Sequence, residues 1–359
     1  MYYNKNMKKG IIVSISILSV ILLSGCSSGS STGSSPSSSD SAGSVWKSID
    51  GGESWNSIVK TNNNGNIASV NILSIAIDST NSQIIFLGTE KDGMFKSTNG
   101  GDEWVKNNLA LGRVYGLAID SKNDQIIYAG GIFGKRGKIF KSENGGDEWN
   151  EIYSEPADGT LISSLEISKI DTNILYVGTN EGMIFKTADG GATWKNLSKT
   201  GGPVVEITFD PMNDSAIYFG IFNEGIIRTK DQGKSFENLN DILKKNGFDA
   251  KVNSIAIDQQ KSGVVYVGLD KGMLRGTEYG NKWEAVNILE TSKKFPIKAI
   301  SINPQNSNEI IYNSAQALYK SVDGGINWAT NQMLSGKIVE IIKYDPTDTK
   351  TMFLGLRKM

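Results

Sequence analysis

Acidic and amide side chains recur at one fixed place in a nine-residue motif, the nonamer, which the sequence repeats seven times. Clear copies are "KSTNGGDEW" at 96–104, "KSENGGDEW" at 141–149 and "KTADGGATW" at 186–194, which follow one another every 45 residues. A catalytic motif would give the chain several copies of one active site, whereas an architectural motif would fill the same structural position each time. The copies end at seven aromatic residues: Trp55, Trp104, Trp149, Trp194, Phe236, Trp283 and Trp328.

The residue types in the nonamer favour the architectural interpretation. An Asp or Asn side chain hydrogen-bonds the backbone two residues further on, and the glycine that follows accepts a positive φ. The final aromatic residue can fill the gap between neighbouring sheets. We therefore predict a structural turn with neither a catalytic nor a metal-binding role. The acid or amide position is filled by Asp50, Asn99, Asn144, Asp189, Asp231, Glu278 and Asp323.

Two further patterns precede the nonamers and predict β-strands. An alternating run such as "ILSIAID" at 72–78 comes first, and a short apolar run such as "IIFLG" at 84–88 follows it. With one strand on each side of the nonamer turn, every repeat supplies four strands, which is typical of a propeller blade. We predict an all-β fold, a seven-bladed β-propeller of four-stranded antiparallel blades.

The two ends of the chain predict how the ring closes. Residues 45–58 supply a third and a fourth strand, whereas 337–345 and 351–356 supply a first and a second strand. The last blade should therefore combine strands from both termini, which leaves no exposed sheet edge. The propeller is expected to occupy residues 45–359.

The nonamer resembles the Asp-box, or BNR repeat, whose pattern is Ser-x-Asp-x-Gly-x-Thr-Trp. Over the propeller, the chain resembles single-propeller Asp-box proteins, in particular the photosystem II stability/assembly-factor-like group and, more distantly, the sortilin ectodomain. The resemblance implies that the nonamers lie on the turn between third and fourth strands, opposite the usual binding face. The first group implies a chaperone or assembly scaffold, and the second implies ligand capture.

Loops on the face opposite the nonamers differ from blade to blade, and such loops on a rigid scaffold are the usual place for function. The segment "GIFGKRGK" at 131–138 is longer and more basic than its equivalents. We expect this face to bind a protein or a glycan, with solvated loops that bind nothing as the alternative. The candidate binding residues are Arg113, Phe133, Lys135, Arg136, Phe222 and Phe248.

Composition bears on the class of function. The chain has no histidine, the commonest general base and transition-metal ligand, and its net charge of −1 gives no reason to expect a nucleic-acid partner. A glycosidase needs two carboxylates across one pocket, and the aspartates that recur at the ends of first strands are explained by turns. We predict a non-catalytic binding or assembly scaffold that is monomeric and needs no cofactor. The alternative is a carbohydrate-active glycoside hydrolase of the Asp-box class.

The N-terminus predicts export and lipidation. Three lysines precede the apolar run "IIVSISILSVILL" at 11–23, which ends in "LLSGC" at 22–26 and resembles a bacterial lipoprotein box. We expect residues 1–25 to be a signal peptide, Cys26 to be lipidated, and the Ser-rich residues 26–44 to be a flexible tether. The anchored protein would face outward from the cytoplasmic membrane, or lie on the outer membrane if the host has one. An ordinary secretory signal is the alternative.

Overall fold

A computed structural model describes residues 43–109, 112–245, 247, 251–289, 294–333 and 335–358. These residues belong to one compact unit, Ser39–Met359. The predicted signal peptide and the predicted lipidation site Cys26 lie outside the described residues, as does the candidate binding residue Phe248.

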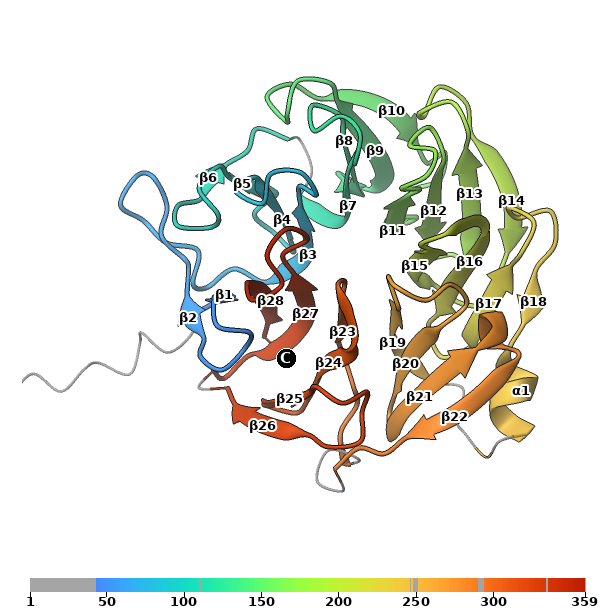
Figure 1. The fold of residues 1–359 in the computed structure, drawn as a ribbon. Helices are drawn as coiled ribbons and strands as arrows, with labels where there is room; N and C mark the ends of the chain where they lie inside the picture. Colours follow the sequence, from blue (N-terminus) through green and yellow to red (C-terminus); the bar gives the residue numbers. More distant parts are fainter. Residues whose placement is uncertain are drawn as a thin grey trace, which may run out of the picture. The chain divides into compact units, whose positions relative to one another are not determined.

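The described strands form seven four-stranded antiparallel sheets arranged in a ring (Figure 1). The first strands surround the centre and are β3 (Ile72–Ile77), β7 (Arg113–Ile119), β11 (Ile162–Ile167), β15 (Val204–Asp210), β19 (Val252–Ile257), β23 (Ile300–Asn303) and β27 (Ile338–Tyr344). The second strands are β4 (Ile85–Thr89), β8 (Ile127–Phe133), β12 (Leu175–Thr179), β16 (Asn213–Ile221), β20 (Val265–Leu269), β24 (Asn306–Ser314) and β28 (Met352–Arg357). Blades 1 to 7 follow this order.

The outer half of each blade contains the two strands that flank the nonamer turn. The third strands are β5 (Met94–Ser97), β9 (Arg136–Ser142), β13 (Met183–Thr187), β17 (Gly225–Thr229), β21 (Gly272–Thr277), β25 (Ala317–Ser321) and β1 (Val45–Ser48). The fourth strands are β6 (Val105–Lys106), β10 (Asn150–Ser154), β14 (Lys195–Lys199), β18 (Glu237–Asn238), β22 (Lys282–Val286), β26 (Ala329–Gln332) and β2 (Asn56–Ser57). Two short helices complete the described elements, α1 (Asn240–Lys245) and the 3-10 helix η1 (Glu278–Gly280).

Blade 7 is built from both ends of the propeller sequence. Its strand order is β2-β1-β28-β27, and β1 pairs with β28 from Val45 opposite Gly355 to Ser48 opposite Met352. The predicted seven-bladed fold and its shared last blade are both confirmed. Because the pairing closes the ring, β1 has a partner on each side and does not present a free edge.

Adjacent blades are held together by apolar clusters to which the terminal aromatic residues of the nonamers contribute. Trp104 of blade 1 is fully buried and packs with Val45 and Phe353 of blade 7. Its Nε1 donates a hydrogen bond to the carbonyl of Ile58 at 2.7 Å. Burial of such a large ring contributes a few kcal/mol at about 25 cal/mol per Å². The predicted packing role therefore holds for this residue, and it lies between blades.

The nonamer turn is a compact hydrogen-bonded loop. In blade 7 the Ser48 hydroxyl donates to Asp50 Oδ1 at 2.8 Å and accepts the Gly52 N–H at 2.8 Å. Asp50 Oδ1 also accepts the Ser54 N–H at 2.9 Å. The acid thus caps an amide four residues on, and the prediction of a bond two residues on is wrong here. The difference arises because the serine hydroxyl already accepts the nearer amides.

The two-residue pattern occurs instead where first strands turn into second strands. The N–H of Thr80 donates to Asp78 Oδ1 at 2.7 Å, and the N–H of Lys122 donates to Asp120 Oδ1 at 2.8 Å. These are Asx-turns. The turn role predicted for the aspartates at the ends of first strands is therefore seen.

The first residue of a nonamer reaches the next blade. Lys47 Nζ donates to the carbonyl of Gly100 at 2.9 Å, and Lys96 Nζ donates to that of Gly145 at 2.7 Å. The nonamer thus links its own blade to the following blade through its lysine, while its aromatic residue packs on the preceding one. This two-sided linkage explains why the motif recurs in every blade.

Candidate functional site

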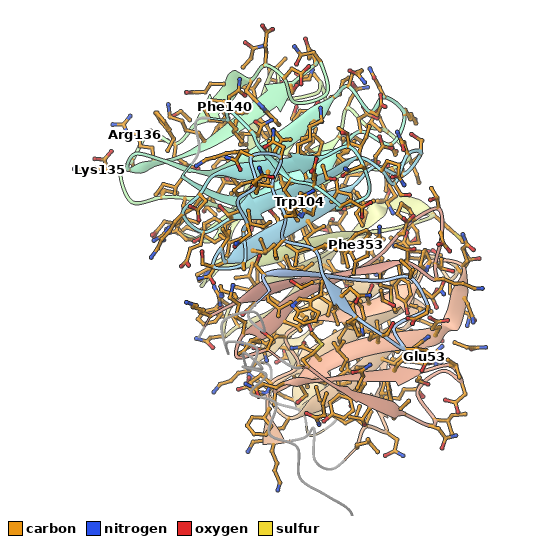
Figure 2. The ribbon with its side chains drawn as sticks, turned by 90° about the vertical axis from the view of Figure 1, so that its left-hand side faces the viewer. Glu53, Trp104, Lys135, Arg136, Phe140 and Phe353 are labelled. Atoms are coloured by element: carbon orange, nitrogen blue, oxygen red, sulfur yellow. The ribbon has the colours of Figure 1, made fainter. Side chains whose placement is uncertain are left out.

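The two faces of the ring carry different kinds of segment. Turns between first and second strands lie with the nonamers on one face, the nonamer face, as the bond from the Gly100 N–H to the Gln83 carbonyl at 3.0 Å shows. The remaining loops lie on the opposite face, the variable face. Figure 2 shows Lys135 and Arg136 at the tip of a hairpin on one side, and Glu53 of a nonamer toward the other.

The five predicted binding residues that the structure describes are exposed but do not form one site. Phe133, Lys135 and Arg136 lie together on the β8–β9 hairpin of blade 2. Arg113 begins β7 in the same blade, whereas Phe222 follows β16 in blade 4. The structure therefore groups the hairpin residues and leaves Phe222 two blades away.

A group of charged and polar side chains lies on the variable face near the start of β7. Arg357 Nη2 lies 3.1 Å from Glu340 Oε1, and Asn71 Nδ2 donates to Glu90 Oε2 at 2.7 Å. The hydrogen bond from Asn71, helped by the positive charges of Arg113 and Arg357, lowers the pKa of Glu90. Glu90 is therefore ionised at neutral pH and is suited to bind a cationic or hydroxyl group, not to donate a proton.

The first strands face the propeller axis, and two of them carry carboxylates there. Glu166 lies on β11, Glu206 on β15 and Lys343 on β27, and each side chain is at least partly accessible to solvent. Water therefore reaches the axis, as in other propellers with a central channel. Lys169 follows β11 and donates to Gln259 Oε1 at 3.1 Å. Glu166, Lys169, Glu206 and Lys343 make up the axial cluster.

Enclosure by the ring changes the proton affinities of the axial cluster. Water reaches part of each carboxylate, but the surrounding protein atoms disfavour the charged form, which raises the pKa of Glu206 to about 7. Enclosure also raises the pKa of Glu166 and lowers that of Lys169. At Glu206, repulsion from Glu166 adds to the shift, whereas a hydrogen bond from the Ile255 N–H (2.8 Å) and attraction by Lys343 oppose it.

With a pKa of about 7, Glu206 is partly protonated near neutral pH, and its proton affinity depends on the charge of Glu166. General acid catalysis on glycosidic bonds uses a protonated carboxyl group together with a second, ionised one. The axial cluster is therefore the candidate active site of the described chain.

Sequence reasoning missed the axial cluster, although a signal was present. Two positions before the Asp, Ser or Asn that begins the turn after each first strand, most blades carry a small side chain, whereas blades 3 and 7 carry Glu166 and Lys343. A charged residue at a repeat position that otherwise holds a small residue indicates a functional role for that residue. The residues at this repeat position are Ala76, Ala118, Glu166, Thr208, Ala256, Ser301 and Lys343.

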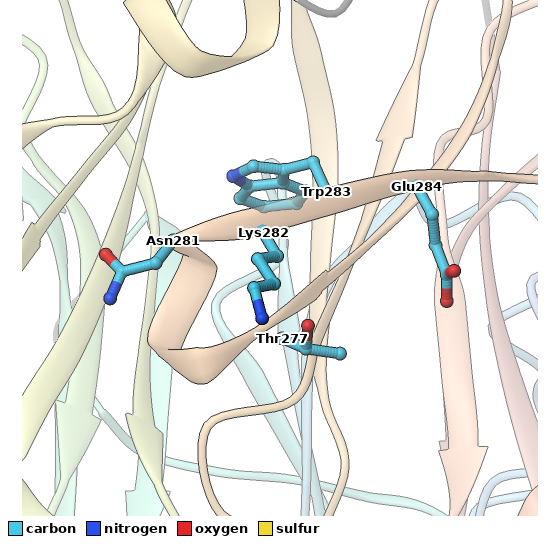
Figure 3. Close-up of a pocket in the computed structure, with 5 residues that line it drawn as sticks. All are labelled: Thr277, Asn281, Lys282, Trp283 and Glu284. Atoms are coloured by element: carbon cyan, nitrogen blue, oxygen red, sulfur yellow. The ribbon is translucent and has the colours of Figure 1, made fainter.

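A separate depression lies on blade 5, away from the axis (Figure 3). It has a volume of about 460 Å³ and is lined by Thr277, Asn281, Lys282, Trp283 and Glu284. Its one carboxylate, Glu284, is paired with Arg275 at 2.7 Å. We favour the axial cluster as the active site because acid–base hydrolysis needs two carboxylates and this depression supplies one.

Two further features concern metals and membranes. Within the described part of the chain, no group of three or more acidic side chains is placed to hold a metal ion. Among the same residues, none of the helices has the length and apolar character needed to cross a bilayer.

A family model described as photosynthesis system II assembly factor YCF48 matches residues 64–214 and 199–347. The chain belongs to the YCF48 family. The resemblance to the photosystem II assembly-factor-like group is thereby confirmed. The likeness to the sortilin ectodomain stays a prediction.

Comparison with individual proteins adds xyloglucanases to the relatives. A probable oligoxyloglucan-reducing end-specific xyloglucanase of Neosartorya fischeri is 26% identical over 157 residues, which cover 36% of this chain and 18% of that protein. The GH74 enzyme of Niastella koreensis has a similar structure, with a TM-score of 0.65 at 18% identity, over 80% of this chain and 51% of that one. The chain thus spans about half of the GH74 enzyme and less than a fifth of the xyloglucanase.

A YCF48 structure also shares the fold. YCF48 bound to D1 peptide superposes with a TM-score of 0.61 at 14% identity, over 80% of this chain and 94% of that one. A propeller of this size and fold can therefore bind a peptide. At these identities the structural likeness establishes the fold alone.

The xyloglucanase relatives correct the functional prediction. The sequence favoured a non-catalytic binding or assembly scaffold, and that prediction is wrong because the relatives matched in sequence are xyloglucanases. They favour the alternative, a carbohydrate-active hydrolase. The expectation that leaned against an enzyme rested in part on finding no carboxylate pair, and the axial cluster contains two carboxyl groups.

Proposed function

We propose that the propeller is a glycoside hydrolase that cleaves a neutral, xyloglucan-like polysaccharide at the axial cluster. The observation that carries the proposal is the carboxyl pair Glu166 and Glu206, in which Glu206 has a pKa of about 7. Xyloglucanases among the relatives supply the class of substrate. A general acid works best when its pKa is close to the working pH.

The chemistry assigns one role to each carboxyl group. Glu206 donates its proton to the glycosidic oxygen as the bond from that oxygen to the anomeric carbon breaks. Enclosure raises the pKa of Glu166, and attraction by Lys343 and Lys169 opposes that rise. In its ionised form, Glu166 stabilises the positive charge that develops on the sugar ring. Water supplies the hydroxyl group that ends on the anomeric carbon, and its remaining proton restores the acid. The configuration of the released sugar shows whether Glu166 acts as nucleophile or as base.

The test measures release of reducing ends from xyloglucan, its oligosaccharides and other β-glucans. Glu206→Gln and Glu166→Gln should each lower kcat by at least about 100-fold, because loss of general acid–base catalysis costs about 10² to 10⁴ in rate. Glu53→Gln, on the nonamer face, is the matched control and should retain full activity. Wild-type hydrolysis should decline as the pH rises through about 7, where Glu206 loses its proton.

Two results would refute this assignment. One is wild-type protein that releases no reducing ends from any glycan in the panel. The other is hydrolysis that survives both axial substitutions, which would place the active site elsewhere on the propeller.

We further propose that Cys26 is lipidated and holds the propeller on the outer side of a bacterial membrane. The proposal rests on the lipoprotein-box resemblance at residues 22–26 and on the Ser-rich tether that follows it. Cys26→Ala should move the protein from the membrane fraction to the soluble or precursor fraction. Full membrane retention of a cleaved Cys26→Ala product would rule out the lipid anchor.

A further inference from the structure

We propose that a raised ridge on blade 2 is a sugar-binding platform, centred on Phe133, for a neutral polysaccharide chain. The ridge consists of the β8–β9 hairpin tip, residues 133–137, and the connection at 155–160. The inference rests on the proposed function for its ligand class, but its evidence is separate because no axial residue takes part.

The ridge projects because the blade 2 hairpin is longer than its neighbours. Strand β8 has seven residues, whereas β4 of blade 1 and β12 of blade 3 have five each. Pairing between β8 and β9 continues to Phe133 opposite Arg136. Figure 2 shows Lys135 and Arg136 at the outer tip of this hairpin. The tip is therefore ordered β-structure that extends beyond the corresponding hairpins of blades 1 and 3.

Backbone hydrogen bonds fix the hairpin to the connection that follows β10. The Gly137 N–H donates to the carbonyl of Thr160 at 2.6 Å, and the Gly159 N–H donates to that of Lys135 at 2.8 Å. The Glu155 N–H donates to the carbonyl of Gly137 at 2.8 Å. These bonds join two loops into one rigid element, so a ligand that binds there does not have to order a mobile loop.

The aromatic ring at the tip is held in place and open to solvent. Phe133 is 45% exposed, and Lys138 Nζ lies 5.0 Å from the centre of its ring. Lys138 is itself fixed by Glu151, with Nζ 2.6 Å from Oε2. A pyranose ring presents an apolar face of C–H groups, and an exposed, pre-positioned aromatic ring can stack against such a face. If Phe133 did not bind a ligand, its ring would only expose an apolar surface to water.

The charges around Phe133 favour a neutral ligand with many hydroxyl groups. Arg136 Nε lies 2.9 Å from Asp158 Oδ1, and both side chains are about half exposed. The pair presents hydrogen-bond donors and acceptors side by side at the surface. The ridge has two basic residues, Lys135 and Arg136, and two acidic ones, Glu155 and Asp158, so its charges balance and a neutral glycan suits it better than a polyanion.

Native gel electrophoresis through xyloglucan tests the platform, because binding retards the protein in proportion to affinity. Phe133→Ala should weaken the affinity about tenfold, the amount expected for one lost aromatic contact and the surface it covers. Phe133→Trp should keep or strengthen the retardation. Ile49→Ala, which removes an exposed apolar residue on the nonamer face, is the matched control and should migrate like the wild type.

The outcomes separate the platform from the hydrolase. Retardation that depends on Phe133 in a protein that cleaves no glycan supports the platform and refutes the hydrolase. Cleavage with unchanged retardation of Phe133→Ala supports the hydrolase and overturns the platform. A wild-type protein that no glycan retards overturns it as well. A melting temperature of Phe133→Ala within about two degrees of the wild type, as expected for a surface change, shows that any lost binding is local.

Discussion

The nonamer face and the axis differ in how strictly the blades repeat, although every blade contributes to both. On the nonamer face, the hydrogen bond from the hydroxyl to the acid or amide recurs in six blades at 2.7 to 3.0 Å, whereas blade 5 has Gly276 in place of the hydroxyl residue. On the axis, the equivalent position holds alanine in several blades but Glu166 and Lys343 in two. The residues that repeat from blade to blade thus stabilise the fold, whereas the residues that differ between blades form the candidate active site.

The comparison has a physical basis. A nonamer makes its bonds within its own turn and to adjacent blades, so each copy meets a similar environment, and most copies keep the hydroxyl residue, the acid or amide and the terminal tryptophan. A side chain on the axis meets those of non-adjacent blades across the ring. It can therefore change without affecting the turns that hold the blades together.

Closure of the ring should have the largest effect on stability. Deletion of residues 338–359 removes β27 and β28 and leaves β1 without its inner partner. We expect aggregation or loss of cooperative unfolding, because the free edge of β1 is then available to pair with other chains. Thermal melting followed by circular dichroism checks this, with removal of Met359 alone as the control. A truncated protein that melts like the full chain would contradict the shared blade.

The buried Lys337 should give the next largest effect, seen as a dependence of stability on pH. Its side chain is 2% exposed, and Nζ donates to the carbonyls of Ala68 and Val70, each at 2.8 Å. Burial, with repulsion from Lys358, lowers its pKa from 10.5 to about 8. The folded protein therefore binds this proton less tightly than the unfolded chain does, and protonation costs stability below pH 8.

That cost is relieved as the pH rises from 8 to 10.5. The free energy of unfolding should increase over this window by about 2–3 kcal/mol in the wild type relative to Lys337→Met. Urea titrations of both proteins at several pH values provide the measurement. Identical pH dependence in the two would show that Lys337 titrates as it does in the unfolded chain.

A single nonamer bond should have a smaller but definite effect. The buried Thr187 hydroxyl accepts the Gly191 N–H at 2.9 Å and donates to Asp189 at 2.7 Å. Thr187→Val keeps the shape and leaves the buried amide without its partner, which should cost about 2 kcal/mol. Ala188→Ser, at the exposed neighbour, should change stability by less than about 0.5 kcal/mol. Denaturant unfolding measures both variants. Equal stabilities would contradict a structural role for the nonamer.

The smallest expected effect is at the axis. The pKa of Glu206 rises from 4.5 to about 7, so the folded state favours the protonated form. Its contribution to stability is complete below pH 4.5 and is lost as the pH rises through 7. Because water reaches part of the side chain, we expect a loss of only about 1 kcal/mol between pH 5 and pH 8, and none in Glu206→Gln. An equal loss of stability in Glu206→Gln would show that another group causes the pH dependence.

Much of the fold was predictable because its determinants are local. The spacing of the nonamers and of the runs before them indicated four strands per repeat, and the incomplete repeats at the two ends indicated the shared blade. The bond made by the nonamer acid was predicted wrongly, since the path of the turn depends on which amides the serine hydroxyl has already accepted.

By itself, the sequence determined the number of blades, the closure of the ring and the place of each nonamer. These features depend on short-range hydrogen bonds and strand periodicity, which consecutive residues determine. Only the tertiary structure placed Glu166, Glu206 and Lys343 on one axis, since they come from three blades and are up to 177 residues apart in the chain. Closing the ring surrounds these charges with protein, and that enclosure shifts their proton affinities. Both the proximity of these distant residues and their enclosure depend on the whole ring, so no single segment of the sequence reveals them.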